Sequence, residues 1–139
     1  MSAVVVGGAG EPARLIAEEM ERGGGFVDAE SLAAYEPVVR DPARGTYRGY
    51  EVLTMPPPSS GGIHVVQMLN ILEHFPVAEL GSGSADNLHL LAEVARLAYA
   101  DRSKHLGDPD FYDVPLEWLL SDEYAEELAG TIDINRARP

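Results

Sequence analysis

The stretch MPPPSSGGIH, residues 55–64, holds the residue types that point most directly to chemistry. It follows an alternating, strand-like run and precedes a long apolar run that is typical of a helix. A serine between a strand and a helix can be the exposed nucleophile of a strand-to-helix turn. The glycines two positions after each serine fit such a turn, so a self-contained serine hydrolase using Ser59 or Ser60 is one interpretation.

The prolines before these serines oppose that interpretation. A nucleophile turn is strained two positions before the serine and needs a small, flexible residue there. Those two positions hold Pro57 and Pro58, whose fixed φ and missing N–H do not suit the turn. A general base is also required. His64 is too close in sequence to act as a distant base, which leaves His89 and His105 as candidates.

The same stretch has a structural interpretation, which we favour. The prolines hold an extended segment, Ser60 caps the helix that follows, and Gly61 and Gly62 allow close packing. The free amide groups of residues 61–63 would also suit an anion, because they lie at a helix N-terminus. We therefore expect a stiff strand-to-helix corner in place of a catalytic turn.

The sequence GAGEPA, residues 8–13, imitates the glycine pattern of a dinucleotide-binding turn. It follows an apolar run and precedes a helical pattern, and Asp28 stands where an acid would bind the ribose. The strand that should precede this acid is missing, because residues 23–27 read GGGFV. A dinucleotide-binding module at Gly8–Ala13 therefore stays an alternative only.

Three acids in one loop, Asp108, Asp110 and Asp113, have the spacing of ligands for a hard cation. No glycine-and-glutamate pattern accompanies them, so an Asx turn and helix caps are the better interpretation. The chain has no cysteine, which excludes disulfides, thiolate metal sites and a cysteine nucleophile. We predict no metal, no cofactor-binding residue and no catalytic residue in this chain.

Two other groups are interpreted structurally. Asp101 and Arg102 are expected to form a buried ion pair or a contact with the proline corner. Trp118 is expected to seal one edge of the core together with Tyr112 and Phe111.

The overall charge limits the possible partners. The 139 residues include 23 acids against 10 lysines and arginines, which gives a net charge of −13. Such a charge repels phosphate backbones and anionic lipids, so neither nucleic acid nor a membrane is an expected partner. The hydrophobic fraction of 45% is typical of a globular chain. The length of 139 residues is enough for one ordinary domain.

The apolar pattern predicts a mostly α-helical α+β chain with one β-hairpin. We expect helices at residues 11–22, after the cap Asp28, at 63–75, at 85–105 after the cap Ser84, and a helical pair at 114–129. We expect strands around Pro37–Arg40 and Tyr47–Met55, with the loop Asp41–Gly45 between them. The helix 85–105 is apolar on two sides, so it should lie between two partners and leave hydrophobic surface exposed in isolation.

Five segments, in this order and spacing, resemble the γ-glutamyltranspeptidase (glutathione hydrolase) family. They are TYRGYEV, MPPPSSGGIHVVQMLNILEHF, LAYADRSKHLGDPDF, VPLEWLLSDEYA and IDINRARP. The resemblance covers residues 10–139 as a single segment, is strongest from Thr46 onward, and leaves residues 1–9 as an unmatched lead-in. It looks like the C-terminal part of the family's large subunit.

The resemblance implies a segment of an N-terminal-nucleophile hydrolase with an αββα fold. In that family a precursor cuts itself, and the new N-terminal threonine of the small subunit attacks a γ-glutamyl amide with its own α-amine as the base. The implied partners are therefore the small catalytic subunit, or a second copy, and the parent substrate is glutathione or another γ-glutamyl compound. The family is commonly periplasmic or extracellular, and the chain itself leaves the compartment unknown.

No catalytic residue of that family can be placed on this chain. The threonines are Thr46, Thr54 and Thr131, and none stands in the family's processing motif. The arginine that grips the substrate lies, in the family, upstream of the matched residues. We expect a structural segment that is inactive by itself, and Gly61-Gly62 are not oxyanion-hole residues.

Overall fold

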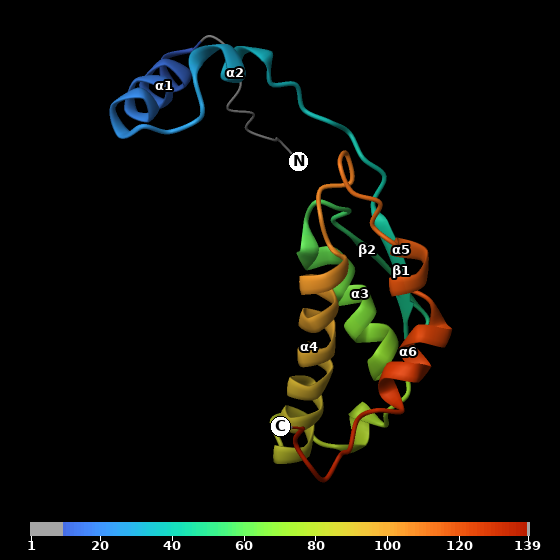
Figure 1. The fold of residues 1–139 in the computed structure, drawn as a ribbon. Coiled ribbons are helices and arrows are strands. Elements are labelled where there is room, and N and C mark those ends of the chain that lie inside the picture. Colours follow the sequence, from blue (N-terminus) through green and yellow to red (C-terminus); the bar gives the residue numbers. More distant parts are fainter. Residues whose placement is uncertain (1–9, 139) are drawn as a thin grey trace. The chain divides into compact units, whose positions relative to one another are not determined.

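The computed structural model describes residues 10–138 and divides the chain at Arg40 into two compact units, each described here by itself (Figure 1). Residues 10–138 are mostly helical, with one two-stranded antiparallel sheet. The expected fold class is therefore confirmed. None of the helices in the described range is long and apolar enough to cross a membrane.

The first unit contains helices α1 (Glu11–Gly23) and α2 (Ala29–Ala34), both at the expected places. The first helix ends because Gly24 takes the left-handed conformation, with φ of 70°, that glycine adopts without steric cost. The carboxylate of Asp28 accepts a hydrogen bond of 2.7 Å from the backbone N–H of Ser31 and so caps α2. Asp28 is therefore a helix cap, as predicted.

The hairpin of the second unit consists of β1 (Ala43–Tyr47) and β2 (Tyr50–Thr54), which pair antiparallel with Gly45 opposite Val52. Its two-residue turn has positive φ at Arg48, 51°, and at Gly49, 81°. This is the requirement of the tight hairpin turn that matches the twist of the strands.

The expected strand boundaries were wrong. The first strand comprises Ala43–Tyr47 and not Pro37–Arg40, so it includes residues that were assigned to the loop. The turn lies at Arg48-Gly49 because the end of α3 holds it there. The Arg48 backbone N–H donates to the Glu73 carboxylate, and its guanidinium donates to the carbonyl of Phe75 at 2.8 Å.

Four α-helices complete the second unit. They are α3 (Ser60–Leu72), α4 (Ala85–His105), α5 (Leu116–Leu119) and α6 (Asp122–Ala129), with a short 3-10 helix η1 (Val77–Glu79) before α4. α4 has the expected bounds, and its predicted cap is confirmed by the Ser84 hydroxyl, which accepts from the N–H of Asn87. α3 begins and ends three residues earlier than the expected range of 63–75.

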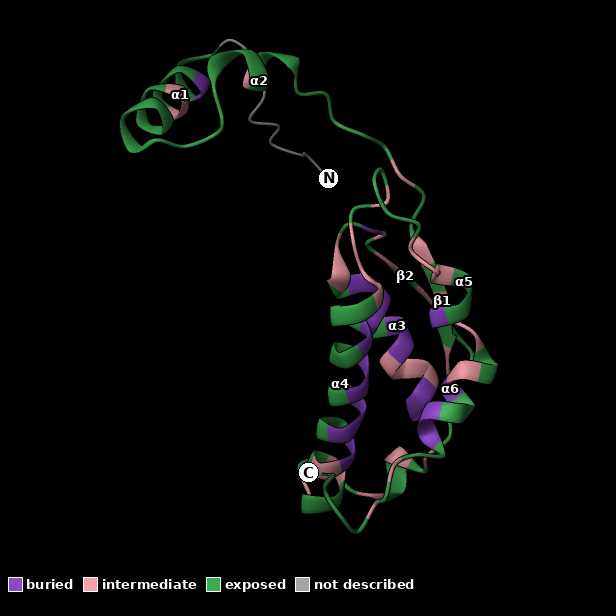
Figure 2. Ribbon diagram, viewed as in Figure 1, coloured by how far each residue is buried: buried purple, intermediate pink, exposed green. Residues whose placement is uncertain are grey.

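α3 is the central element of this unit, because it contacts both strands, α4 and α6 (Figure 1). Eight buried side chains of α3, α4 and α6 form one hydrophobic cluster. In Figure 2 the buried residues of these helices are coloured purple along their facing sides. The cluster consists of Ile71, Leu72, Leu90, Val94, Leu97, Ala125, Leu128 and Ala129.

Two glycines let the hairpin and α3 approach closely. A Cβ added at Gly45 would stand 2.3 Å from the Cγ1 of Val66, and one at Gly62 would stand 2.2 Å from the backbone oxygen of Met55. A Cβ at Gly61 would meet nothing closer than the Ser59 hydroxyl at 3.8 Å. The predicted close packing is therefore confirmed at Gly62 and not at Gly61.

We predict that Gly62→Ala destabilises the chain while Gly61→Ala does not. The added methyl of Gly62→Ala meets backbone atoms of Met55, which cannot move aside without disturbing β2, so the free energy of unfolding should fall by about 1–3 kcal/mol or more. Gly61→Ala should leave it unchanged or raise it by up to about 1 kcal/mol, since alanine is the better helix former. Urea unfolding followed by circular dichroism measures both. Equal effects of the two variants would contradict the close approach.

Candidate functional site

The serines of the proline corner before α3 are not placed as predicted. Ser59 is the N-cap residue of α3 and makes no capping hydrogen bond with its side chain, while Ser60 is the first helical residue. The hydroxyl of Ser60 accepts a hydrogen bond of 3.1 Å from the Nε of Arg102 on α4. Ser60 is therefore not the cap. It is already the first residue of the helix, and its hydroxyl bonds to Arg102 of α4.

Next to this corner lies a small pocket of about 250 Å³. Its lining comes from the corner (Pro58 and Ser60), from Arg102, and from Leu106 and Gly107 just after α4. The guanidinium of Arg102 and the first residue of α3 line this pocket, whereas residues 61–63, where an anion was expected, do not. That expectation stays a prediction.

The three histidines considered as bases all have other contacts. His64 is buried, and its Nδ1 lies 2.9 Å from the Oε1 of Gln67. The Nε2 of His89 lies 2.9 Å from the backbone oxygen of Asp133, and the ring of His105 stands edge-on to Trp118 at 5.1 Å. Among the described residues no histidine forms a hydrogen bond with Ser59 or Ser60, so a serine hydrolase would lack its base here.

The most ordered polar arrangement is a buried chain of hydrogen bonds that joins α3, α4 and α6. Asp101 of α4 accepts a bond of 2.6 Å from the Nε2 of Gln67 on α3. The same carboxylate accepts from the hydroxyl of Tyr124 on α6, at 2.9 and 3.0 Å to its two oxygens. His64, Gln67 and Asp101 are each at least 94% buried.

The directions of these bonds show which ring nitrogen of His64 donates to Gln67. Because the amide nitrogen of Gln67 donates to Asp101, its oxygen is the acceptor and the Nδ1 of His64 is the donor. The Nε2 of His64 is buried and has no hydrogen-bond partner within residues 10–138. Neither Gln67 nor Tyr124 was singled out from the sequence. A glutamine inside the apolar stripe of α3 was the available signal, since a buried polar side chain needs a partner.

The predicted alternatives for Asp101 and Arg102 separate in the structure. Asp101 turns inward to Gln67 and Tyr124 and does not pair with Arg102. Arg102 is exposed and makes the predicted contact with the proline corner, through Ser60. The predicted ion pair was therefore wrong, because neighbouring residues of a helix point about 100° apart. The predicted contact between Arg102 and the proline corner is confirmed.

The acidic loop behaves as an Asx turn. The carboxylate of Asp108 accepts a bond of 3.0 Å from the backbone N–H of Asp110, as expected for such a turn. Within the described residues no three histidines, cysteines or acids, Asp113 included, are grouped so that they could hold a metal ion.

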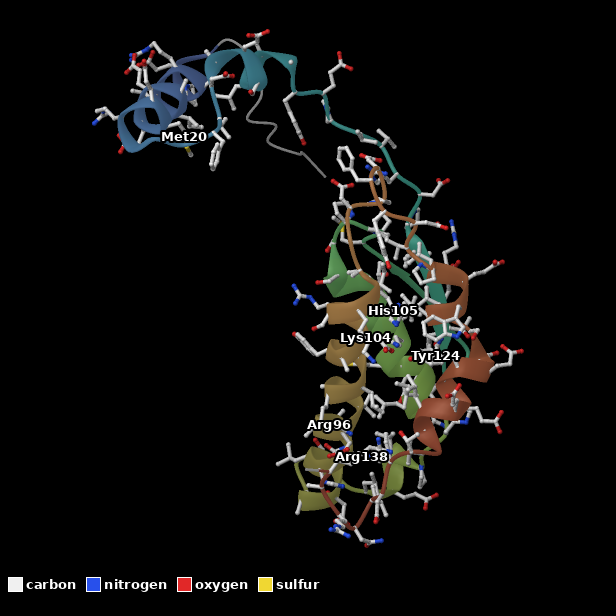
Figure 3. All side chains as sticks on the ribbon, viewed as in Figure 1. Met20, Arg96, Lys104, His105, Tyr124 and Arg138 are labelled. Atoms are coloured by element: carbon white, nitrogen blue, oxygen red, sulfur yellow. The ribbon has the colours of Figure 1, made fainter. Side chains whose placement is uncertain are left out.

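The predicted aromatic seal was wrong in part. Trp118 packs against the ring of Tyr124, with centroids 4.0 Å apart, and against His105. Tyr124 and His105 are labelled in Figure 3. Phe111 is 91% exposed and seals nothing within this unit, because the short loop after α4 turns it outward. Tyr112 instead lies against Gly107, whose missing side chain makes room for the ring.

The dinucleotide interpretation also finds no support. Gly8 and Ala9 lie outside the described residues. Gly10 precedes α1, and between α1 and α2 the described chain forms no strand. Without a second strand and with Asp28 bound to Ser31, the parts of the βαβ unit are not assembled.

Comparisons with known proteins agree with this architecture. The model of the family described as Gamma-glutamyltranspeptidase matches residues 9–139. The glutathione hydrolase proenzyme of Escherichia coli (strain K12) is 55% identical over 130 residues, which are 94% of this chain and 22% of that protein. The Acylase ACY 1 proenzyme of Pseudomonas sp. (strain SE83) is 44% identical over 93% of this chain and 23% of its own length. The structure of Helicobacter pylori γ-glutamyltranspeptidase matches with a TM-score of 0.84 and 43% identity, over 94% of this chain and 37% of that one.

The helical layer with its hairpin therefore has the fold of part of an N-terminal-nucleophile hydrolase. Within that class the chain belongs to the γ-glutamyltranspeptidase family. The chain spans less than a quarter of the two curated relatives that it matches here.

We predict that Tyr124→Phe lowers stability and that the difference from the unchanged chain shrinks in alkali. Loss of the hydroxyl removes a donor to the buried Asp101 carboxylate, which should cost about 1.5–3 kcal/mol of unfolding free energy at neutral pH. Burial, and then the hydrogen bond to Asp101, raise the pKa of Tyr124 above its ordinary value. Its stabilisation is therefore complete below about pH 10, where an unfolded tyrosine ionises, and is lost as the pH rises above that value.

Denaturant unfolding from pH 7 to pH 11 measures this difference. Tyr99→Phe is the matched control, since Tyr99 is 59% exposed on α4, and it should change stability by less than about 0.5 kcal/mol. An effect of Tyr124→Phe no larger than that of the control would contradict the role of the hydroxyl.

Proposed function

We propose that this chain is a structural segment of a larger enzyme that hydrolyses or transfers γ-glutamyl groups. The observation that carries the proposal is the alignment of 94% of the chain with 22% of a glutathione hydrolase proenzyme at 55% identity. The substrate proposed for the whole enzyme is glutathione or another γ-glutamyl compound. The likeness to an acylase proenzyme, at 44% identity, makes another acyl donor the second candidate.

The chain is proposed to contain no catalytic residue, and the placement of its threonines supports this. An N-terminal nucleophile needs a free α-amine as its base, so the chain must be cut directly before it. A cut before Thr46 or Thr54 would interrupt one strand of the hairpin. The hydroxyl of Thr131 donates to the carbonyl of Leu128 at 2.6 Å, where it ends the turn after α6.

The proposed partner is the part of the enzyme that contains the catalytic threonine, as a small subunit of the same precursor. Two relatives are named as proenzymes. In this proposal residues 1–139 act as one segment, without a cofactor or a metal. The net charge of −13 further supports the expectation that nucleic acid is not a partner.

The role of the segment follows from its construction. α3 joins the hairpin to α4 and α6, and the buried Asp101 joins the three helices to one another. Such a unit can serve as a rigid layer against which the catalytic part of the enzyme is built. It supplies shape to the precursor and no reacting group.

A chimeric proenzyme tests this proposal. Residues 10–139 should replace the aligned segment of the E. coli glutathione hydrolase proenzyme, and the unchanged E. coli protein is the positive control. We expect the chimera to cut itself and to hydrolyse a chromogenic γ-glutamyl anilide, because 55% of the aligned residues are identical. A chimera that is soluble and folded but neither processed nor active would contradict the proposal.

The isolated chain provides the second half of the test. It should hydrolyse no γ-glutamyl anilide and should not react with a fluorophosphonate probe, since no described histidine bonds to Ser59 or Ser60. Labelling that disappears in Ser59→Ala or Ser60→Ala would show a serine hydrolase instead.

A further inference from the structure

The longest helix, α4, has two apolar faces, and only one of them is covered. Leu90, Val94, Leu97 and Ala98 point into the core and are at most 9% exposed. On the other side lies what we name the α4 outer face, and Figure 2 shows exposed residues along that side of the helix. The α4 outer face consists of Leu88, Leu91, Ala92, Ala95 and Tyr99.

The residues of the α4 outer face follow one another at helical spacing. Successive members are three, one, three and four positions apart, which places them in one stripe along the helix. Its three large side chains are strongly exposed: Leu88 by 58%, Leu91 by 42% and Tyr99 by 59%. A continuous apolar stripe of this kind marks an interaction surface, whereas single exposed apolar residues need no explanation.

The C-terminal end of this face has a positive charge. Arg102 continues the stripe, with its guanidinium 6.0 Å from the ring centre of Tyr99. Its hydrogen bond goes to the neutral hydroxyl of Ser60, so no carboxylate of the described residues neutralises it. The positive charge of Arg102 therefore has no acidic partner among residues 10–138, although the chain has 23 acids and only 10 lysines and arginines. A partner that fits this surface presents an apolar strip with a carboxylate opposite Arg102.

We propose that the α4 outer face is the surface on which the rest of the same enzyme docks. This inference rests on the proposed function, and the relatives supply its second support. More than three quarters of the E. coli proenzyme lies outside the match, so most of the surface that could cover this helix belongs to that remainder. Burial of the face would give α4 the two-sided environment that its sequence predicts.

Glutamine substitutions on α4 test the proposal, since glutamine and leucine have similar helix propensities. The double variant Leu91→Gln/Tyr99→Gln should leave the melting temperature of the isolated chain within about 2 °C of the unchanged one, because both side chains are already exposed there. In the chimeric proenzyme it should reduce the yield of soluble, processed enzyme about tenfold or more, since two large apolar side chains lose their cover. Ala100→Gln is the matched control, on an exposed side of the same helix that lies outside the outer face, and should change neither quantity.

Each alternative has its own outcome. If the double variant lowers the melting temperature of the isolated chain by more than about 5 °C, the face belongs to the chain's own core and the proposal is wrong. A second outcome would identify the occupant as another copy of this chain. In that case light scattering shows a dimer of the isolated chain, the double variant abolishes the dimer, and the chimera that carries the double variant is still processed. A chimera with unchanged residues that is never processed contradicts the proposed function, whereas a working chimera that ignores the double variant contradicts only this inference.

Discussion

The carboxylate of Asp101 is the interaction on which the second unit depends. It lies almost fully buried at the centre of three helices, and an ionised carboxylate without partners is too costly to keep in such a place. Gln67 and Tyr124 supply the required donors, from residues 34 and 23 positions away in the sequence. A small rotation of α3 or α6 about its axis would remove one of these donors, so the carboxylate selects one arrangement of the three helices.

The apolar contacts provide most of the stabilisation, and the polar chain provides the register. The cluster around Ile71, Leu90 and Leu128 favours packing of these helices in any arrangement that buries them. The hydrogen bonds from His64 to Gln67 and from Gln67 to Asp101 are directional, so they form only in the observed arrangement of the helices. The close approach of Gly62 to Met55 has a similar effect on the hairpin, since only a residue without a side chain fits there.

These constraints explain how the segment that we propose, with no catalytic residue of its own, would serve a larger enzyme. Its proposed task is to hold a surface in place. The α4 outer face lies on the same helix as Asp101, whose carboxylate binds α3 and α6 on the inner side. Variation that loosens the polar chain would therefore disturb the proposed docking surface as well. The hydrogen bond from Arg102 to Ser60 also joins the proline corner to α4.

Much of the local structure could be predicted because it depends on near neighbours in the chain. Caps such as Asp28 and Ser84, the glycine that ends α1 and the apolar periodicity of α4 act within one or two helical turns. The family was also readable, since motifs such as PPPSSGG remain visible in the bare sequence. The hairpin register was missed for the opposite reason: Arg48 takes positive φ because Glu73 and Phe75, at the far end of α3, hold it.

The sequence by itself thus determined which segments are helical, which family they belong to, and that Pro57 and Pro58 oppose a serine nucleophile. Only the tertiary structure decided that Ser60 bonds to Arg102, that Asp101 joins three helices through Gln67 and Tyr124, and which face of α4 stays open. The physical reason is that periodicity and capping are short-range. The partner of a buried polar group depends instead on how distant helices meet.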